Sequence, residues 1–218
     1  MKTKIYENKK IIIGLVTLFV FVIVQFYSIV KTVFAQTSPA TDGVLVSLDV
    51  TSGITISNGA DVTMAPNMGI TSDSSIGTSS WLVKTNSLGG YTLAVKASTT
   101  PALKSGINSF ADYTEASTGV PESWSIAGGD KEFGYSAYGT DTNGATWGTA
   151  GSCGSAGLPD VAQKYVGFST LDKTIATRAA VTPTSGITTT ICFAAAQNAV
   201  YAASGSYTAT ITATATTL

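Results

Sequence analysis

The sequence predicts an all-β protein, an antiparallel β-sandwich preceded by an N-terminal hydrophobic helix. Three observations lead to this fold class. The 218 residues include 22 glycines and only 11% charged residues, whereas about 25% is typical of soluble domains. Ser, Thr and Asn supply much of the polarity, and this composition favours strands and turns over helices. Short runs that alternate between apolar and polar residues are separated by Gly, Pro and Asn, with no long helical repeats between them.

The first 35 residues have the pattern of an export signal. A basic start at 1–10 is followed by an apolar run at 11–30 and a signal-peptidase pattern ending at Ala35, so cleavage would leave Gln36 as the new N-terminus. About 20 apolar residues also suffice to span a bilayer, and a retained signal-anchor is therefore the alternative. With either outcome we expect the rest of the chain at the cell surface or outside the cell. The membrane would then be contacted only through this N-terminal segment.

The predicted organisation is a signal peptide or signal-anchor at 1–35, a flexible linker at 36–43 and one β-sandwich domain at 44–218. The chain after residue 35 contains seven basic and twelve acidic residues, a net charge of −5. Nucleic-acid binding needs a positively charged surface, so this balance excludes that class of partner.

The domain is predicted to begin with a strand at 44–50, where apolar and polar residues alternate. A turn at Ser52-Gly53 leads into a short apolar run at 54–56. Asn58-Gly59 is a strong hairpin signal, and residues 66–77 have the composition of a loop.

Residues 79–98 are the clearest feature of the sequence and are predicted to form a central hairpin. Two alternating runs, at 81–85 and 91–97, flank the polar break Asn-Ser-Leu-Gly-Gly at 86–90. A connection of this length and composition is ordinary for a β-hairpin. The aromatic residues of this stretch are expected to face the core.

The middle of the chain is less regular. Residues 99–120 are punctuated by Pro and Gly and are expected to form an irregular crossover, with a short helical turn at 110–115. Strands are predicted at 123–126 and 132–138. Residues 139–160 form a long loop rich in Gly and Ser, and a loop of this length inside a compact domain is usually functional or mobile.

Three further strands are expected, at 164–169, 187–195 and 207–216, whereas residues 171–180 fit either a strand or a helical turn. The last strand has the cleanest alternation, with threonines along one face. Threonine is a common solvent-facing strand residue. Alternatively, an uncharged strand edge can pair with the edge of another subunit, which would give self-association.

The two cysteines are predicted to form a disulfide. Cys153 lies in the long loop and Cys192 in a predicted strand. A single pair of cysteines in an exported chain most often forms one bond. Two buried free thiols are the alternative. The spacing of the cysteines does not match a zinc or redox motif.

The chain contains no histidine, which excludes Ser-His-Asp catalysis, Cys-His catalysis and the usual zinc sites. A run that begins at Asp141 resembles the start of a calcium loop, but Thr146 and Ser152 stand where an EF-hand needs Gly and Glu. We therefore expect no metal, no cofactor and no enzymatic activity.

Aromatic residues of the long loop are the candidate ligand-binding residues. Trp147, with Tyr138 and Asn143 near it in sequence, could stack on and hydrogen-bond to a sugar. The alternative is that Trp147 anchors the Gly-rich loop at the edge of the sandwich near Cys153.

Several segments resemble secreted bacterial β-sandwich surface proteins of the WxL-domain-like kind. The segments are Trp-Leu-Val at 81–83, Gly-Tyr-Thr-Leu at 90–93 and the closing Gly-Ser-Tyr-Thr-Ala-Thr-Ile-Thr at 205–212. The resemblance covers about a third of the mature chain and implies an Ig-like or WxL-like sandwich at the bacterial cell surface. It also implies peptidoglycan binding, although Trp81 and Trp124 do not continue into a WxL motif of the family's pattern.

These observations predict an exported, non-enzymatic cell-surface protein with a structural, adhesive or assembly role. A carbohydrate- or peptidoglycan-binding module is the alternative. The partners expected are cell-wall glycan, other surface proteins or further copies of the chain joined by strand edges.

Overall fold

The structure, a computed structural model, describes residues 12–25, 42–57 and 59–218. It divides into two compact units, Met1–Asp49 and Val50–Leu218. In the first unit a helix spans residues 12–25, and residues 42–49 have neither helical nor strand structure. No helix in the described part of the chain has both the length and the apolar character needed to cross a membrane. The predicted cleavage site at Ala35 and Gln36 lies outside the described residues.

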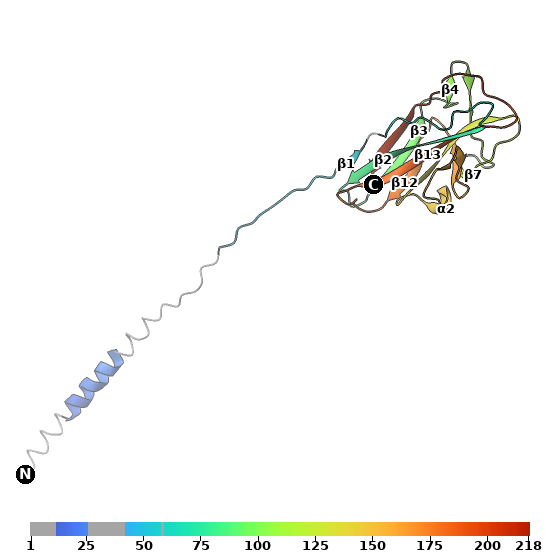
Figure 1. Cartoon of the computed structure of the whole chain (residues 1–218). Helices are drawn as coiled ribbons and strands as arrows, with labels where there is room; N and C mark the ends of the chain where they lie inside the picture. The colour runs from blue at the N-terminus through green and yellow to red at the C-terminus, as the bar shows by residue number, and fades with distance from the viewer. Residues whose placement is uncertain (1–11, 26–41, 58) are drawn as a thin grey trace, which may run out of the picture. The chain divides into compact units, whose positions relative to one another are not determined.

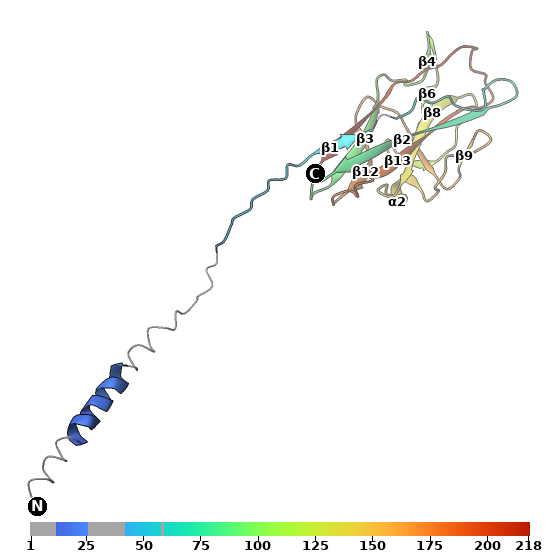
Figure 2. The ribbon, with the colours of Figure 1, turned by 60° about the vertical axis from the view of Figure 1, so that its left-hand side comes forward.

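The second unit is mostly β and has two main sheets, which confirms the predicted sandwich-like packing of antiparallel sheets. Figure 1 shows the strands of this unit, and Figure 2 shows them from a second direction. The larger sheet contains, in spatial order, β1 (Ile54–Ile56), β2 (Ser74–Thr85), β13 (Ile187–Gln197), β8 (Lys131–Gly139), β11 (Lys164–Gly167) and β7 (Glu122–Ser123). One further short strand, β6 (Ala111–Asp112), pairs with β8 in parallel.

The smaller sheet has the order β12 (Lys173–Arg178), β3 (Tyr91–Ala97) and β14 (Ile211–Thr217). Two minor hairpins and one helical turn complete the unit. They are β4 (Lys104–Ser105) with β5 (Asn108–Ser109), β9 (Gly154–Ser155) with β10 (Leu158–Pro159), and α2 (Gly144–Trp147).

The core lies between the two sheets and follows from the alternation in the sequence. In β3 every second residue from Tyr91 to Ala97 is buried, and in β2 the same holds for Trp81, Val83 and Thr85. Aromatic rings fill the centre, where Phe168 stacks on Tyr135 with ring centroids 4.3 Å apart. Burying side chains of this size is the main stabilising contribution to the sandwich.

The predicted central hairpin at 79–98 is wrong in one respect. Both strands exist, but β2 pairs with β1 and β13, whereas β3 pairs with β12 and β14. The break at 86–90 therefore carries the chain from one sheet to the other. The buried faces of the two strands are both rich in apolar residues, and they are covered when they face each other across the core instead of lying side by side in one sheet.

Other local predictions were corrected by pairing that depends on distant residues. The expected helical turn at 110–115 is the strand β6, and the undecided stretch 171–180 contains the strand β12. The expected loop at 66–77 already includes the start of β2. Residues 54–56 pair with β2, so they do not belong to a local hairpin at Asn58, which lies outside the described residues.

The predicted strand at 44–50 is not formed in the structure. These residues have no strand assignment, and Val44, Val46, Leu48 and Val50 are 76–86% exposed. A strand is defined by its hydrogen-bonded neighbour, and none of the described strands pairs with this segment. The residues alternate as they would in a strand, but none of the described strands lies beside them to form the hydrogen bonds.

Candidate functional site

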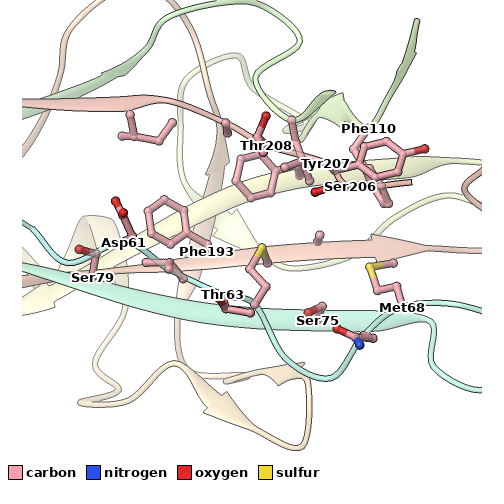
Figure 3. A pocket seen from close by; sticks show the side chains of 18 of the residues that line it. Asp61, Thr63, Met68, Ser75, Ser79, Phe110, Phe193, Ser206, Tyr207 and Thr208 are labelled. Carbon is pink, nitrogen blue, oxygen red and sulfur yellow. The ribbon is translucent and has the colours of Figure 1, made fainter. Parts of the chain in front are cut away.

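An open groove of about 1520 Å³ runs along one side of the sandwich in the second unit. We call it the inter-sheet groove. It lies between residues 59–70 and the faces of β2 and β13 on one side, and residues 201–213 with Phe110 on the other. Figure 3 shows Phe193 and Met68 on one side of this space and Phe110 and Tyr207 on the other.

The floor of the groove is built by the larger sheet. Trp81, Phe133 and Phe193 present their side chains to it, and all three are at least 92% buried. Gly77 of β2 lets the neighbouring segment approach closely, because a Cβ at this position would lie 2.5 Å from Cγ1 of Val62. The floor is therefore closely packed and apolar.

The opposite wall is formed by the chain that leads into β14. Tyr207 packs edge-to-face on Phe110 with ring centroids 5.2 Å apart, and its hydroxyl donates to the carbonyl of Ala203 at 2.9 Å. Ile211 and Ala213 point to the inner side of the sheet but are only partly buried. These inward side chains keep solvent contact because the groove is open beside them.

One buried side chain holds both rims of the groove. Gln197, which is 4% exposed, donates from Nε2 to the carbonyl of Gly69 at 2.8 Å. Its Oε1 accepts from the backbone N–H of Ala202 at 2.9 Å. Since Gly69 and Ala202 lie on opposite rims, this amide fixes the distance between them at this end of the groove.

The strand β14 borders the groove with a free edge. The N–H of Ser98 donates to the carbonyl of Thr210 at 3.0 Å, and the N–H of Leu218 donates to the carbonyl of Gly90 at 3.1 Å. Bonded and non-bonded residues alternate in such a ladder, so the intervening odd-numbered residues direct their N–H and C=O groups away from β3. No described strand pairs with β14 on that side. The odd-numbered residues are Ile211, Ala213, Ala215 and Thr217.

The inter-sheet groove carries little charge. Asp61 is the one acidic residue among its described lining residues, which include no lysine or arginine. No group of three or more Cys, His, Asp or Glu residues suited to a metal lies within the described residues. The arrangement offers an apolar floor and an unpaired backbone edge, which are the two features that bind an extended polypeptide.

The structure places the predicted ligand-binding residues elsewhere and separates their roles. Trp147 is only 2% exposed and packs against Tyr135 with ring centroids 5.6 Å apart, and together with Asn143 it lines the small cavity beside the long loop that is described below. Asn143 caps α2 by accepting the N–H of Ala145 at 2.9 Å. Tyr138 is partly buried and packs near the disulfide. The alternative prediction, Trp147 as an anchor for the Gly-rich loop, agrees with this burial.

The predicted disulfide between Cys153 and Cys192 is confirmed. Both residues are buried, and Cys192 on the central strand β13 is fully enclosed. Three aromatic side chains pack in the same cluster as the disulfide. Trp124 stacks on Tyr113 with ring centroids 4.5 Å apart and contacts Tyr165 edge-to-face with ring centroids 5.3 Å apart. Burial raises the pKa of Tyr113 to about 12.

A second small cavity of about 460 Å³ lies beside the long loop, next to Asp141. This carboxylate accepts the hydroxyl of Tyr91 at 2.8 Å and pairs with Arg178 at 3.2 Å. Burial raises the pKa of Tyr91 well above its usual range, and the hydrogen bond to Asp141 adds to the rise. All three polar groups are satisfied by one another, which is typical of a structural anchor for the loop.

The residues of the inter-sheet groove were not predicted as a site. Their signals in the sequence were weak, since Val62, Met64 and Phe110 fall in stretches without regular alternation. The threonine ladder of the last strand was the one feature that indicated a pairing edge. Comparison with protein-family models, with curated proteins and with solved structures found no match.

Proposed function

We propose that this chain is an exported, non-enzymatic surface protein whose inter-sheet groove binds an extended polypeptide segment, which gives it a structural or assembly role. The observation that carries the proposal is the coincidence of an apolar groove with the free edge of β14. Adding a strand at that edge would satisfy the unpaired N–H and C=O groups. It would also cover the partly buried side chains of Ile211 and Ala213.

Two further features support export. The buried disulfide suggests an oxidising compartment outside the cytoplasm, where such bonds form and persist. The apolar N-terminal run of the sequence fits a signal peptide or anchor. The proposal therefore agrees with the resemblance to WxL-domain-like bacterial surface proteins, while it assigns the binding role to the groove instead of a glycan site at Trp147.

The location is tested on intact cells of a bacterial host that exports the full chain. Lys84 on the outer face of β2 is exposed, so a membrane-impermeant amine reagent should label the domain without lysis. Alkylation before reduction should find no free thiol. A protein that is labelled only after lysis and has two free thiols would overturn the export part of the proposal.

The binding role is tested by a photo-crosslinking amino acid placed in the full chain at Thr63, an exposed residue that lines the groove. The control position is Thr214, which lies on the solvent face of β14 and does not line the groove. We expect a covalent adduct with a polypeptide from Thr63 and none from Thr214. Adducts with glycan alone, equal adducts from both positions, or no adduct would contradict the proposal.

A further inference from the structure

The apolar segment (residues 44–50) is exposed to an unusual degree. Val44, Leu45, Val46, Leu48 and Val50 are 82, 93, 85, 86 and 76% exposed. Valine and leucine are mostly buried in folded proteins, and a continuous exposed run of them usually marks an interaction site. Within the described residues this is the one run outside the helix in which five large apolar side chains lie so close together in sequence and remain exposed.

The pattern of the segment suits a β-strand with one apolar face. In an extended chain Val44, Val46, Leu48 and Val50 lie on the same side, and Leu45, Ser47 and Asp49 lie on the other. β-branched and large apolar residues favour strands. The segment thus has the sequence of a strand, whereas the structure gives it no strand partner.

The free edge of β14 and the inter-sheet groove match this pattern. Seven residues in a strand extend over about 23 Å, which is close to the length of the seven-residue strand β14. When a strand lies beside β14, every second side chain enters the groove, which is lined by apolar and uncharged polar residues with Asp61 as the one charged residue among its described lining residues. The other face, with Asp49, points to solvent. The carboxylate of the incoming strand is therefore not buried.

Residues 51–53, which follow the segment in sequence, are held by the end of β2 and the residue after it. The side chain of Asn86 accepts the N–H of Gly53 at 2.7 Å and donates to the carbonyl of Thr51 at 2.8 Å. The hydroxyl of Thr85 donates to the carbonyl of Gly53 at 2.8 Å.

We propose that the apolar segment of one copy adds as a strand to the free edge of β14 of a second copy and places Val44, Val46, Leu48 and Val50 in its inter-sheet groove. The inference rests on the proposed function, because it names the polypeptide that the groove binds. Each copy offers both a segment and a groove. Repetition of this contact links copies head to tail.

The first experiment measures self-association of the purified full-length chain by light scattering over a range of concentrations. We expect wild-type chains of several copies, and V46D/L48D should associate about 100-fold more weakly, because burial of each apolar side chain contributes about tenfold or more. Both positions are exposed, so the substitutions do not disturb the folded core. The matched control S47D changes the opposite face and should associate like wild type.

The second experiment identifies the contact. A photo-crosslinking amino acid at Leu48 should join the segment to residues 207–217, and mixing isotope-labelled with unlabelled protein should show that the two peptides come from different copies. A link within one copy would show that the segment closes its own groove. A link to lipid, to detergent or to another polypeptide, or unchanged association of V46D/L48D, would also overturn the inference.

The two proposals fail separately. A polypeptide adduct from Thr63 together with a monomeric chain would leave the proposed function standing and remove the second copy as the occupant. Absence of any adduct from Thr63 would count against the proposed function itself. Association that does not depend on residues 46 and 48 would refute only this inference.

Discussion

Removal of the disulfide should strongly destabilise the sandwich. Cys153 and Cys192 are 39 positions apart, and closing a loop of that length contributes about 4 kcal/mol in the chain-entropy treatment. The double substitution C153A/C192A removes the link, and both sites are buried beneath the aromatic cover. We therefore expect its free energy of unfolding to be about 4 kcal/mol lower than that of the oxidised wild type.

The loop that the bond closes contains a strand of each sheet, β11 and β12. Without the link the unfolded chain gains conformational freedom in this region, and both sheets lose stability together. For a domain of this size, 4 kcal/mol corresponds to a fall in melting temperature of about 8–16 °C.

The assay is urea denaturation followed by tryptophan fluorescence, with the melting temperature measured by circular dichroism. Wild type under reducing conditions serves as the matched control, because it has the same side-chain atoms without the link. It should unfold within about 1 kcal/mol of C153A/C192A. If the oxidised protein and the double variant differ by less than about 1 kcal/mol, the argument from loop closure is refuted.

Three further predictions concern the packing of the domain. D141N should lower the free energy of unfolding by about 1–3 kcal/mol, because it weakens the contacts of this carboxylate to Tyr91 and Arg178. The control D172N removes an exposed ion pair and should change the free energy of unfolding by less than about 1 kcal/mol. Equal urea midpoints for the two variants would contradict this ranking. G77V should lower the stability measured in a thermal melt by about 1–3 kcal/mol, since its side chain would collide with Val62 in the wall of the groove. The control G128A places its methyl group in open space and should melt within a few degrees of wild type. The contribution of Tyr113 to stability should be constant below about pH 10 and be lost from pH 10 to about 12, because the folded state keeps the proton that the unfolded state releases. Urea titrations at pH 9 and 11.5 with equal midpoints would show that buried tyrosines do not contribute.

The sequence was informative where a strand has one buried face. Alternation predicted β3, β8, β13 and β14 close to their observed positions, although only β3 and β14 alternate in burial and the central strands β8 and β13 are largely buried on both faces. The disulfide could also be predicted, since two cysteines in a chain that is expected to be exported leave one pairing. Both inferences depend on local pattern and composition.

Pairing between distant residues could not be predicted from pattern alone. The strands β2 and β3 are adjacent in sequence and fit a hairpin, yet they belong to different sheets because their apolar faces meet across the core. The short strand β6 forms only against β8, whose position depends on the whole sheet. The groove is harder still to predict, because it exists only where β14 and residues 59–70 are brought together.

The candidate glycan residues show the same limit. Trp147 lies in a Gly-rich loop, a setting in which tryptophan serves either as a ligand platform or as an anchor. Trp147 is the last residue of α2, and its burial depends on packing against Tyr135 of β8, which the local sequence pattern does not show. The exposed fraction of the tryptophan side chain, and not the residue type, distinguishes a ligand platform from an anchor.

The pairings of β1 with β2 and of β3 with β14 also determine how the domain would carry mechanical load. A pull on residues 44–50 enters through β1, which is joined to β2 by three residue pairs along the strand direction. It then follows the chain from β2 to β3 and leaves through the seven pairs between β3 and β14. The disulfide joins Cys153 directly to Cys192, so the 38 residues between them cannot be extended under load. The short β1 ladder is the element that would yield first under tension. The hydrogen bonds from Thr85 and Asn86 to the carbonyl groups of Gly53 and Thr51 would then help to set the force at which the domain begins to unfold.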